Sequence, residues 1–333
     1  MRFHQIFTLS VLSASLMANM ALGKQNTADV FYYDLSDQFV ANLAKDIKAE
    51  AARKGIELKV FNAAGDQLTQ TTQLEEDLNT EATVLMNLVD VGQAAHVIEK
   101  AKKNKQRIIF FNREPATTDL ESYDDAWYVG ADAVQAGDYQ AELVIDYIKA
   151  HPEVDHNKDG KISLVILKGE KTHQETESRT RAVLRELEQN KIPYEITFEA
   201  YTNWSFSQGY DYMAAELTQK GIDKTELVIG NNDALVLGAI QALADYGYNQ
   251  GNPDKFIPVF GIDAIPEALS AINAGNMTGT VLNDASAMAK AIIGIAATQG
   301  KNPEEVAKNI GYFVSHDHKV MIPYIKITHR GTK

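Results

Sequence analysis

Oxygen-bearing side chains recur through residues 155–163 with the spacing of a calcium-binding loop. Asp or Asn occupies positions 1, 3 and 5, and Gly160 stands at position 6, where such loops turn sharply. In an EF-hand a glutamate at position 12 completes the coordination, but here that position is Ile166, inside an apolar run typical of a buried strand. The segment is therefore either an Asx-rich turn or a calcium loop whose last carboxylate comes from a distant part of the chain.

Polar residues also stand where short apolar runs of the chain end. Seven of these runs are predicted to be β-strands: residues 30–32, 83–86, 107–111, 163–167, 227–229, 257–260 and 280–282. Amides and carboxylates follow six of them, at Asn87, Asn112, Lys168-Gly169-Glu170, Asn231-Asn232-Asp233, Asp263 and Asn283-Asp284. Helix capping explains one such residue, but six indicate a cleft, because open α/β sheets bind ligands beyond the carboxyl ends of their strands.

The residue types of this cleft exclude several chemistries. No Gly-rich phosphate-binding motif follows a strand, no Gly-x-Ser-x-Gly elbow is present, and the lack of cysteine excludes thiol nucleophiles and zinc–thiolate sites. The remaining Asp, Asn, Arg and His side chains suit the hydroxyls of a sugar, because planar polar groups donate and accept hydrogen bonds in pairs. Phe39 and Trp204 suit the apolar faces of a pyranose, although core packing explains each of them equally well.

Amphipathic stretches separate the predicted strands and indicate helices over residues 36–54, 91–104, 133–149, 175–189 and 207–220. Repeated alternation of strands and helices predicts an α/β fold with parallel sheets covered on both faces. The chain has 333 residues, of which 45% are hydrophobic. This is enough for a large core divided between two domains.

The first 23 residues resemble a secretory signal peptide, with Arg2 ahead of an apolar stretch and Ala21-Leu22-Gly23 as the cleavage site. Removing them lowers the count of Lys and Arg from 32 to 31 against 45 Asp and Glu, so the formal net charge changes from −13 to −14. This acidic balance argues against nucleic acid or anionic lipid as a partner. Because no cysteine is available to carry a lipid anchor, we expect an outer membrane to retain the exported protein in the periplasm.

Six segments of the mature chain carry a further signal. They are residues 37–39, 108–115, 167–170 with His173 and Arg179, 231–234, 258–264 and 279–284. Together they resemble the galactose/glucose-binding family of periplasmic proteins of bacterial ABC sugar uptake, over nearly the whole mature sequence. The resemblance implies the type I periplasmic binding protein fold, with two doubly wound parallel-sheet lobes joined by a three-segment hinge.

This fold implies a division of the chain into a signal peptide and two lobes. The expected segments are residues 1–23 for the signal peptide, 24–131 plus 282–320 for the N-terminal lobe, and 132–281 plus 321–333 for the C-terminal lobe. The hinge crossings are expected near residues 131–133, 280–282 and 318–322. A ligand that touches both lobes then favours a closed form, because those contacts exist only when the lobes meet.

Carried over position by position, the resemblance implies that Phe39 and Trp204 enclose a sugar ring. The side chains implied to bond its hydroxyls are Asp37, Asn112, His173, Glu175, Arg179, Asn232, Asp263 and Asn283. At Glu175 the family has an Asp, and the added methylene can re-route a hydroxyl contact. The segment Asp34-Leu35-Ser36 also departs from the family. The identity of the sugar is therefore less constrained than sugar binding itself.

The same resemblance implies that residues 155–163 bind Ca²⁺, because the family closes a nine-residue loop with a remote glutamate, here Glu226. The implied ligands are Asp155, Asn157, Asp159, the carbonyl of Lys161, Ser163 and Glu226. Ser163 is shorter than the Gln usual at the ninth position of the loop. Either Ser163 contacts the ion directly, or a water molecule bridges the gap.

The resemblance implies a binding protein and not an enzyme. It would capture a monosaccharide, galactose or glucose, and deliver it as a monomer to an ABC permease, with a chemoreceptor as a further candidate partner. Two alternatives stay open: a binding protein for another hexose, and a glycoside-processing enzyme that uses Asp37, Glu175 or Asp263. Such catalysis needs one carboxyl group with a raised pKa, whereas carboxylates beside Arg179 are expected to stay ionised.

Overall fold

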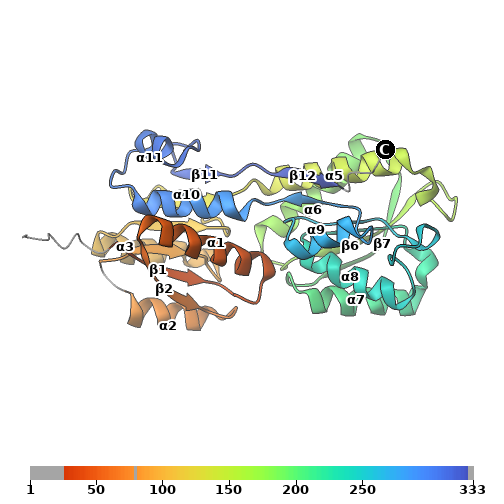
Figure 1. Ribbon diagram of the computed structural model, residues 1–333, viewed down its shortest axis with the longest axis horizontal. Coiled ribbons are helices and arrows are strands. Elements are labelled where there is room, and N and C mark those ends of the chain that lie inside the picture. The colour runs from red at the N-terminus through yellow and green to blue at the C-terminus, as the bar shows by residue number, and fades with distance from the viewer. Residues whose placement is uncertain (1–25, 79–80, 329–333) are drawn as a thin grey trace, which may run out of the picture.

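The computed structural model describes residues 26–78 and 81–328 as two lobes, each built on one six-stranded sheet (Figure 1). The predicted signal peptide, residues 1–23, lies outside the described residues. Within these two ranges, none of the helices has both the length and the apolar character needed to cross a bilayer.

The first lobe has the strand order β11-β5-β4-β3-β1-β2, and all its neighbouring strands are parallel. The strands are β1 (Thr27–Tyr32), β2 (Glu57–Asn62), β3 (Thr83–Met86), β4 (Ile108–Phe111), β5 (Ala126–Gly130) and β11 (Lys319–Met321). One face packs against α1 (Gln38–Lys54), α10 (Ala285–Ala297) and α11 (Pro303–Ile310). The other face packs against α2 (Gln67–Asp77), α3 (Ala94–Asn104) and α4 (Thr117–Leu120).

The second lobe has the strand order β7-β6-β8-β9-β10-β12. The strands are β6 (Ile162–Lys168), β7 (Tyr194–Tyr201), β8 (Leu227–Gly230), β9 (Val259–Phe260), β10 (Gly279–Leu282) and β12 (Ile325–Thr328). One face packs against α5 (Ala133–Ala150) and α6 (Gln174–Gln189), and the other against α7 (Phe206–Lys220), α8 (Asp233–Asp245) and α9 (Pro266–Asn273). The edge strand β12 runs antiparallel to β10, so this sheet is not purely parallel as predicted.

The two sheets repeat one connectivity. In each lobe the second strand, β2 or β7, lies outside the first, and the chain then crosses to the other side to form the third, β3 or β8. The strand order therefore reverses between β1 and β3 and between β6 and β8. Open α/β sheets bind ligands beyond the carboxyl ends of their strands at such a reversal, so the fold marks one position in each lobe for a site.

Three segments connect the lobes, along the upper edge in Figure 1. They follow β5, β10 and β11, at residues 131–132, 283–284 and 322–324. Leu282, expected in the N-terminal lobe, pairs with Ile325 in the second sheet, and Met321, expected in the C-terminal lobe, pairs with Gly130 in the first. Backbone pairing in the sheets thus continues to the ends of β10 and β11 before the chain crosses.

Helix α1 illustrates how the sequence sets the limits of an element. Asp37 caps its N-terminus by accepting a hydrogen bond from the Val40 N–H at 3.0 Å. Gly55 ends it in the left-handed conformation, with φ of 66°, which glycine adopts without steric cost. Leu43 and Ile47, spaced one turn apart, are fully buried with Val40 in the first-lobe core, so one face of α1 fixes the position of its N-terminus.

The seven predicted strands and five predicted helices are confirmed, with ends that differ by a few residues. The apolar-run pattern does not predict β2, β5, β7, β11 or β12. Strands β2 and β7 lie at sheet edges and are largely solvent-accessible, so neither contains a continuous apolar run. Strands β11 and β12 have 3 and 4 residues, too few for a periodic signal.

Candidate functional site

A small pocket lies between the lobes, beyond the carboxyl ends of both sheets. All ten residues predicted to bind the ligand line it: Asp37, Phe39, Asn112, His173, Glu175, Arg179, Trp204, Asn232, Asp263 and Asn283. Tyr33 and Arg113 complete the lining. The cavity measures about 20 Å³, room for about one water molecule. A sugar ring can therefore enter only after the lobes part or side chains withdraw.

Asp37 faces the pocket from the first lobe, at the N-terminus of α1. Its Oδ1 accepts the Val40 N–H and its Oδ2 accepts the Tyr33 hydroxyl at 2.5 Å. Burial raises the pKa of Asp37, against the opposing effect of these hydrogen bonds and of the Arg113 charge. The two hydrogen bonds hold the carboxyl group in one orientation toward the pocket.

Asn112 follows β4 with a φ of 62°, a left-handed conformation that Asn tolerates better than most residues. Its Oδ1 accepts a hydrogen bond from Asn87 Nδ2 at 3.2 Å, and its main-chain carbonyl accepts one from the Tyr128 hydroxyl at 2.9 Å. Asn87 is fully buried and also donates to the carbonyl of Phe111 at 3.2 Å. Asn87 therefore acts as a positioning residue that orients the Asn112 amide.

His173 caps α6 in the second lobe, and its Nδ1 accepts the Glu175 N–H at 3.2 Å. Burial, followed by the positive charges of Arg113 and Arg179, lowers the pKa of His173 well below its ordinary value. The imidazole is therefore neutral at physiological pH. Since Nδ1 is the acceptor, the proton lies on Nε2, which makes that atom a donor for a ligand.

Arg179 connects several parts of the second-lobe side. Its Nη1 donates to the Asn231 carbonyl at 2.8 Å, and its Nη2 donates to the Tyr324 hydroxyl and to Glu175 Oε2, both at 3.0 Å. Burial opposes the charge of Arg179, but Glu175, Tyr324 and Asp263 together raise its pKa above the ordinary value. The guanidinium thus stays charged and is held in one plane.

Two polar atoms of this pocket have no hydrogen-bond partner, Arg179 Nε and Asn283 Oδ1. Five buried side-chain atoms in the described part of the chain share that property, and this donor and this acceptor lie in the same pocket. Leaving a buried polar group unpaired costs about 1–3 kcal/mol. A hydroxyl group can both accept and donate, so a hydroxylated ligand would relieve that cost at both atoms.

Trp204 reaches the pocket through a strained turn after β7. Asn203 and Trp204 have φ of 47° and 59°, and a left-handed conformation is uncommon for residues other than glycine, above all for one as large as Trp. The indole lies edge-on to the His173 ring, with the centroids 5.3 Å apart. Phe39, on the opposite lobe, also belongs to the first-lobe core, so core packing and ligand contact are both served by this residue.

Gly169 allows the Trp204 indole to approach the β6 backbone. A Cβ at this position would lie 2.2 Å from Cζ2 of Trp204, closer than atoms can pack. We therefore expect Gly169→Ala to displace the indole and weaken ligand binding about 5- to 150-fold, since overpacking costs about 1–3 kcal/mol. Calorimetric titration measures the affinity; an unchanged dissociation constant would show that the indole position does not matter.

Burial and the charge of Arg179 act in opposite directions on the carboxyl groups of the pocket. Burial raises the pKa of Glu175 and raises the pKa of Asp263 well above its ordinary value, although Arg179 lowers both. The expectation that carboxylates beside Arg179 stay ionised therefore stays a prediction, because burial opposes ionisation while the charge of Arg179 favours it. Asp263 Oδ1 also accepts a hydrogen bond from Asn283 Nδ2 at 3.3 Å, and Asn232 Oδ1 caps α8 at 3.1 Å from the Leu235 N–H.

Asp233, directly behind the pocket, predicts a pH dependence of stability. Its Oδ1 accepts the Thr280 hydroxyl at 2.6 Å and its Oδ2 accepts the Ile265 N–H at 3.0 Å, and burial raises its pKa from 3.8 to about 7. A raised carboxyl pKa stabilises the fold fully below about pH 4, and this contribution is lost between about pH 4 and 7.

Relative to the parent protein, Asp233→Asn should therefore gain free energy of unfolding as the pH rises through that range. The gain is at most about 4 kcal/mol, because each pH unit corresponds to about 1.36 kcal/mol. Urea unfolding at a series of pH values measures it. Parallel curves for the two proteins would contradict the assignment.

An ion pair across the lobes was not predicted from the sequence. Arg113, after β4, donates from Nη2 to Glu170 Oε1, after β6, at 2.7 Å, and its guanidinium stacks 3.6 Å from the centroid of the Tyr33 ring. Arg113 is 5% exposed and Glu170 29%, so solvent screens the pair only in part. The pair exists only while the lobes are together. The ion pair therefore favours closure of the lobes, although neither of its residues is among the predicted ligand-binding residues.

The predicted calcium loop, residues 155–163, lies in the yellow-green connection after α5 in Figure 1. In the structure two backbone N–H groups of this loop donate to Glu226. Glu226 Oε1 accepts the Asn157 N–H at 3.2 Å and Oε2 accepts the Ser163 N–H at 2.8 Å. Asp155 and Asp159 accept the N–H groups of Gly160 and Lys161 at 3.0 and 2.9 Å. The apparent defect at position 12 thus has a counterpart, a buried carboxylate from elsewhere in the chain.

The oxygen atoms of this loop are of the type that a hard cation binds, but they do not converge on one point in this structure. Carboxylate, amide, hydroxyl and carbonyl oxygens are what Ca²⁺ prefers. However, the described residues contain no cluster of three or more His, Asp or Glu side chains arranged to hold a metal. In this structure the carboxylates turn toward backbone N–H groups, so ion binding would require them to converge.

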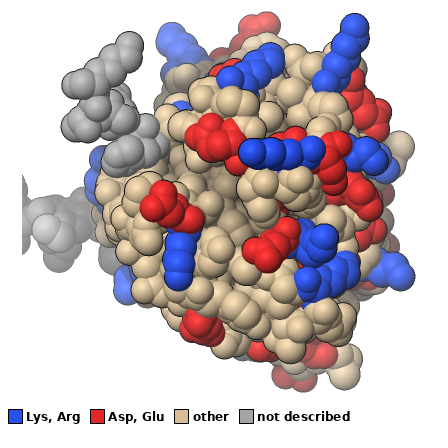
Figure 2. Space-filling view, turned by 90° about the vertical axis from the view of Figure 1, so that its right-hand side faces the viewer, with Lys and Arg blue, Asp and Glu red and all other residues tan. Residues whose placement is uncertain are grey.

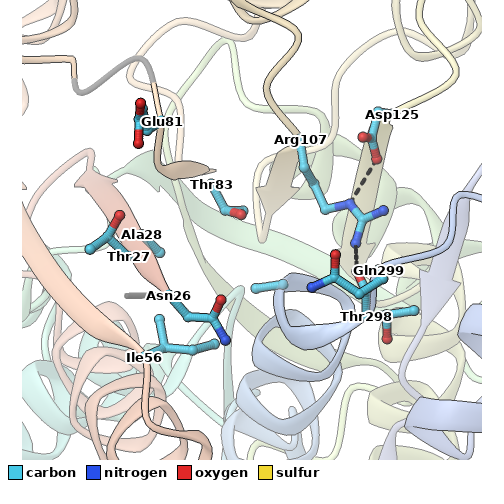
Figure 3. Close-up of a pocket in the computed structure, with 11 residues that line it drawn as sticks. Asn26, Thr27, Ala28, Ile56, Glu81, Thr83, Arg107, Asp125, Thr298 and Gln299 are labelled. Atoms are coloured by element: carbon cyan, nitrogen blue, oxygen red, sulfur yellow. Dashed lines mark hydrogen bonds and ion pairs between the residues drawn. The ribbon is translucent and has the colours of Figure 1, made fainter. Parts of the chain in front are cut away.

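A further cavity of about 200 Å³ lies at the opposite end of the first-lobe sheet, beside Asn26 and Thr83 (Figure 3). Arg107 extends into it and donates to Asp125 Oδ1 at 2.7 Å and to the Ile295 and Gly300 carbonyls at 2.8 and 2.6 Å. These contacts engage the guanidinium, so Arg107 ties the end of α10 to the sheet and is not an anion site.

Charged side chains of both signs are interspersed on the end of the molecule formed by the second lobe (Figure 2). The net negative charge of the chain is therefore not gathered into a single acidic patch on this face.

Comparisons with known proteins agree with this architecture. Residues 28–303 match a family model described as a periplasmic binding protein domain. The chain is 35% identical over 314 residues to the D-galactose/methyl-galactoside binding periplasmic protein MglB of Haemophilus influenzae, covering 93% of this chain and 92% of the relative. It is 26% identical to a putative rhizopine-binding protein of Rhizobium meliloti, with 97% and 96% covered.

A solved structure of similar fold is an ABC transporter solute binding protein from Bacillus halodurans with bound myo-inositol. Its TM-score is 0.72 at 25% identity, with 92% of this chain and 95% of that chain covered. A galactofuranose binding protein gives a TM-score of 0.73 at 17% identity, which supports the fold alone.

Proposed function

The chain belongs to the periplasmic binding protein family, and from this we propose that it captures a monosaccharide between its lobes and delivers it to an ABC permease. The unpaired Arg179 Nε and Asn283 Oδ1 support this most strongly, because a buried donor and a buried acceptor share one pocket. The neutral His173 and the fixed amide of Asn112 add polar contacts of known orientation.

D-galactose is the first candidate ligand, since the relative with 35% identity is named for D-galactose and methyl-galactoside. Glucose follows from the same residue set. The sugar contacts at Glu175 would differ from those of the family's Asp, because Glu175 Oε2 already pairs with Arg179 at 3.0 Å. For that reason a hexose other than galactose or glucose is kept as a candidate ligand.

Closure of the lobes follows from the origin of the contacts. Asp37, Phe39 and Asn112 come from the first lobe, while His173, Arg179 and Trp204 come from the second. A ligand held by both sets binds the closed form better than the open one, and this difference in affinity shifts the population. The closed surface is what the permease, and by extension a chemoreceptor, would recognise. The protein acts as a monomer and releases the sugar unchanged.

Calcium belongs to the proposal as a structural ion. Asp155, Asn157, Asp159, the Lys161 carbonyl, Ser163 and Glu226 would hold it, and it would supply positive charge that ties the loop to the strand β8. Export by residues 1–23 and retention in the periplasm without a lipid anchor complete the proposal.

Intrinsic fluorescence tests sugar capture, because one of the two Trp residues lies in the pocket and Trp127 is buried in the first lobe. Hexoses and pentoses are titrated into the mature protein, and D-galactose or D-glucose should change the emission. Trp204→Phe keeps an aromatic face but should lose the signal. No change with any sugar would argue against the proposal.

The enzymatic alternative is tested with chromogenic glycosides. The raised pKa values of Asp263 and Glu175 are compatible with a general acid, so the assay is informative. We expect no turnover. Hydrolysis that disappears in Asp263→Asn would favour the enzyme.

A further inference from the structure

A groove of about 540 Å³ adjoins the pocket and shares Tyr33, Asp37 and Trp204 with it. We propose that this groove is an outer subsite for the second unit of a glycoside, so that the protein binds a sugar ring together with a neutral, hydroxylated substituent. This inference rests on the proposed function, because the outer unit is held through the ring in the pocket.

The topology leaves the groove open for such a substituent. Its walls come from the loops after β1, β2, β6 and β7, which lie at the sheet edges opposite β11 and β12. The segment that joins β11 to β12, residues 322–324, therefore does not cover the groove. Its volume is typical of small-molecule sites, which measure about 300–1,000 Å³.

Polar side chains on both walls suit the hydroxyls of a second unit. On the first lobe, Gln38 Oε1 is buried without a hydrogen-bond partner, so it needs a donor. On the second lobe, the hydroxyls of Ser205 and Ser207 lie 2.9 Å apart, and Asn203 Nδ2 donates to Gln208 Oε1 at 3.1 Å. The groove is thus lined on one lobe by a side chain whose acceptor has no protein partner, and on the other lobe by groups that donate and accept.

Phe206 supplies an apolar surface in the same groove. It is the first residue of α7, two positions after Trp204, and it is 40% exposed although it is a large aromatic residue. Aromatic rings contact the C–H faces of sugar rings, so Phe206 would serve an outer ring as Trp204 serves the inner one.

The charges of the groove define the substituent further. Its lining includes Asp34, Asp37 and Glu170, and neither Lys nor Arg occurs among its described lining residues. Asp34 Oδ1 accepts the Ser36 N–H at 2.8 Å, and Glu170 pairs with Arg113. A phosphate or uronate would meet three carboxyl groups with no cation among the lining residues to offset them. The lining therefore disfavours an anionic outer unit, and its serine and amide side chains suit a neutral, hydroxylated one.

Titration calorimetry on the mature protein tests the subsite. The probes are the free hexose that binds best, its α- and β-methyl glycosides, disaccharides that carry it in different linkages, and its phosphate ester. At least one disaccharide should bind one to one, with a dissociation constant within about 10-fold of the hexose, while the phosphate ester should bind at least about 10-fold more weakly than the hexose.

Phe206→Ala separates the groove from the pocket, because Phe206 does not line the pocket. It should weaken the disaccharide at least about 10-fold and the free hexose less than about 2-fold, and Ser207→Ala should act in the same direction more weakly. Binding of the hexose without any disaccharide, or equal losses for both ligands in Phe206→Ala, would overturn the subsite and leave the proposed function intact. Failure of every hexose to bind would instead refute the proposed function.

Discussion

Arg179→Met is expected to raise the dissociation constant for the preferred sugar by about 100-fold, or about 2.7 kcal/mol. The substitution removes the Nε donor that has no protein partner and the positive charge beside Glu175. Hydrogen bonds to charged groups contribute about 1.5–3 kcal/mol, and a buried carboxyl group left without its cation adds a further cost. Calorimetric titration of the variant measures the loss.

The double variant Arg179→Met, Glu175→Gln provides the control for folding. It removes the unpaired carboxyl group together with the guanidinium, so it should unfold at a higher temperature than Arg179→Met while its sugar affinity stays low. Glu175→Gln alone keeps the Nε donor and should bind sugar better than either. Sugar affinity restored in the double variant would mean that Arg179 serves the fold and not the ligand.

Glu226→Ala is expected to abolish a rise in melting temperature that the parent protein shows in calcium. A ligand present at 100 times its dissociation constant stabilises a fold by about 2.7 kcal/mol, which corresponds here to a shift on the order of 5 °C. Glu226 carries the buried carboxylate that contacts the loop at Asn157 and Ser163. Thermal unfolding with calcium and with a chelator measures the difference.

Sugar affinity is the matched readout, because Glu226 lies directly before β8 and outside the pocket lining. Glu226→Ala should leave the dissociation constant for sugar nearly unchanged. Glu226→Gln keeps the size of the side chain and should still lose most of the calcium shift. If calcium does not change the melting temperature of the parent protein, the loop is an Asx-rich turn.

The sequence predicts the fold, and the residues that line the pocket, better than it predicts the contacts among those residues. Strand ends are recognisable because apolar runs stop at polar residues, and parallel strands bring those ends to one edge of each sheet. Asn112 of the first lobe and Asn232 and Asp263 of the second therefore meet in the pocket between the two sheets. The apolar-run pattern does not predict the edge strands β2 and β7, because their partial burial leaves no continuous apolar run. Glu226 was placed beside its loop through family resemblance, since no local pattern connects it to residues 155–163.

Three-dimensional effects account for what the sequence does not reveal. The contact of Arg113 with Glu170 joins two strand ends from different lobes. Both residues lie in segments that carry the family resemblance, but no pattern in the sequence pairs one with the other. The raised pKa of Asp263 depends on complete burial, which outweighs the charge of Arg179. Burial can be estimated from the sequence for apolar residues but not for a carboxyl group at a strand end.

Calorimetric titration of the mature protein with D-galactose, D-glucose, D-xylose and D-ribose tests the central claim most directly. Capture between two lobes predicts heat and one-to-one stoichiometry with at least one hexose, and recovery of that sugar unchanged after denaturation of the complex. Absence of heat with all four sugars, or recovery of a chemically altered sugar, would contradict the account.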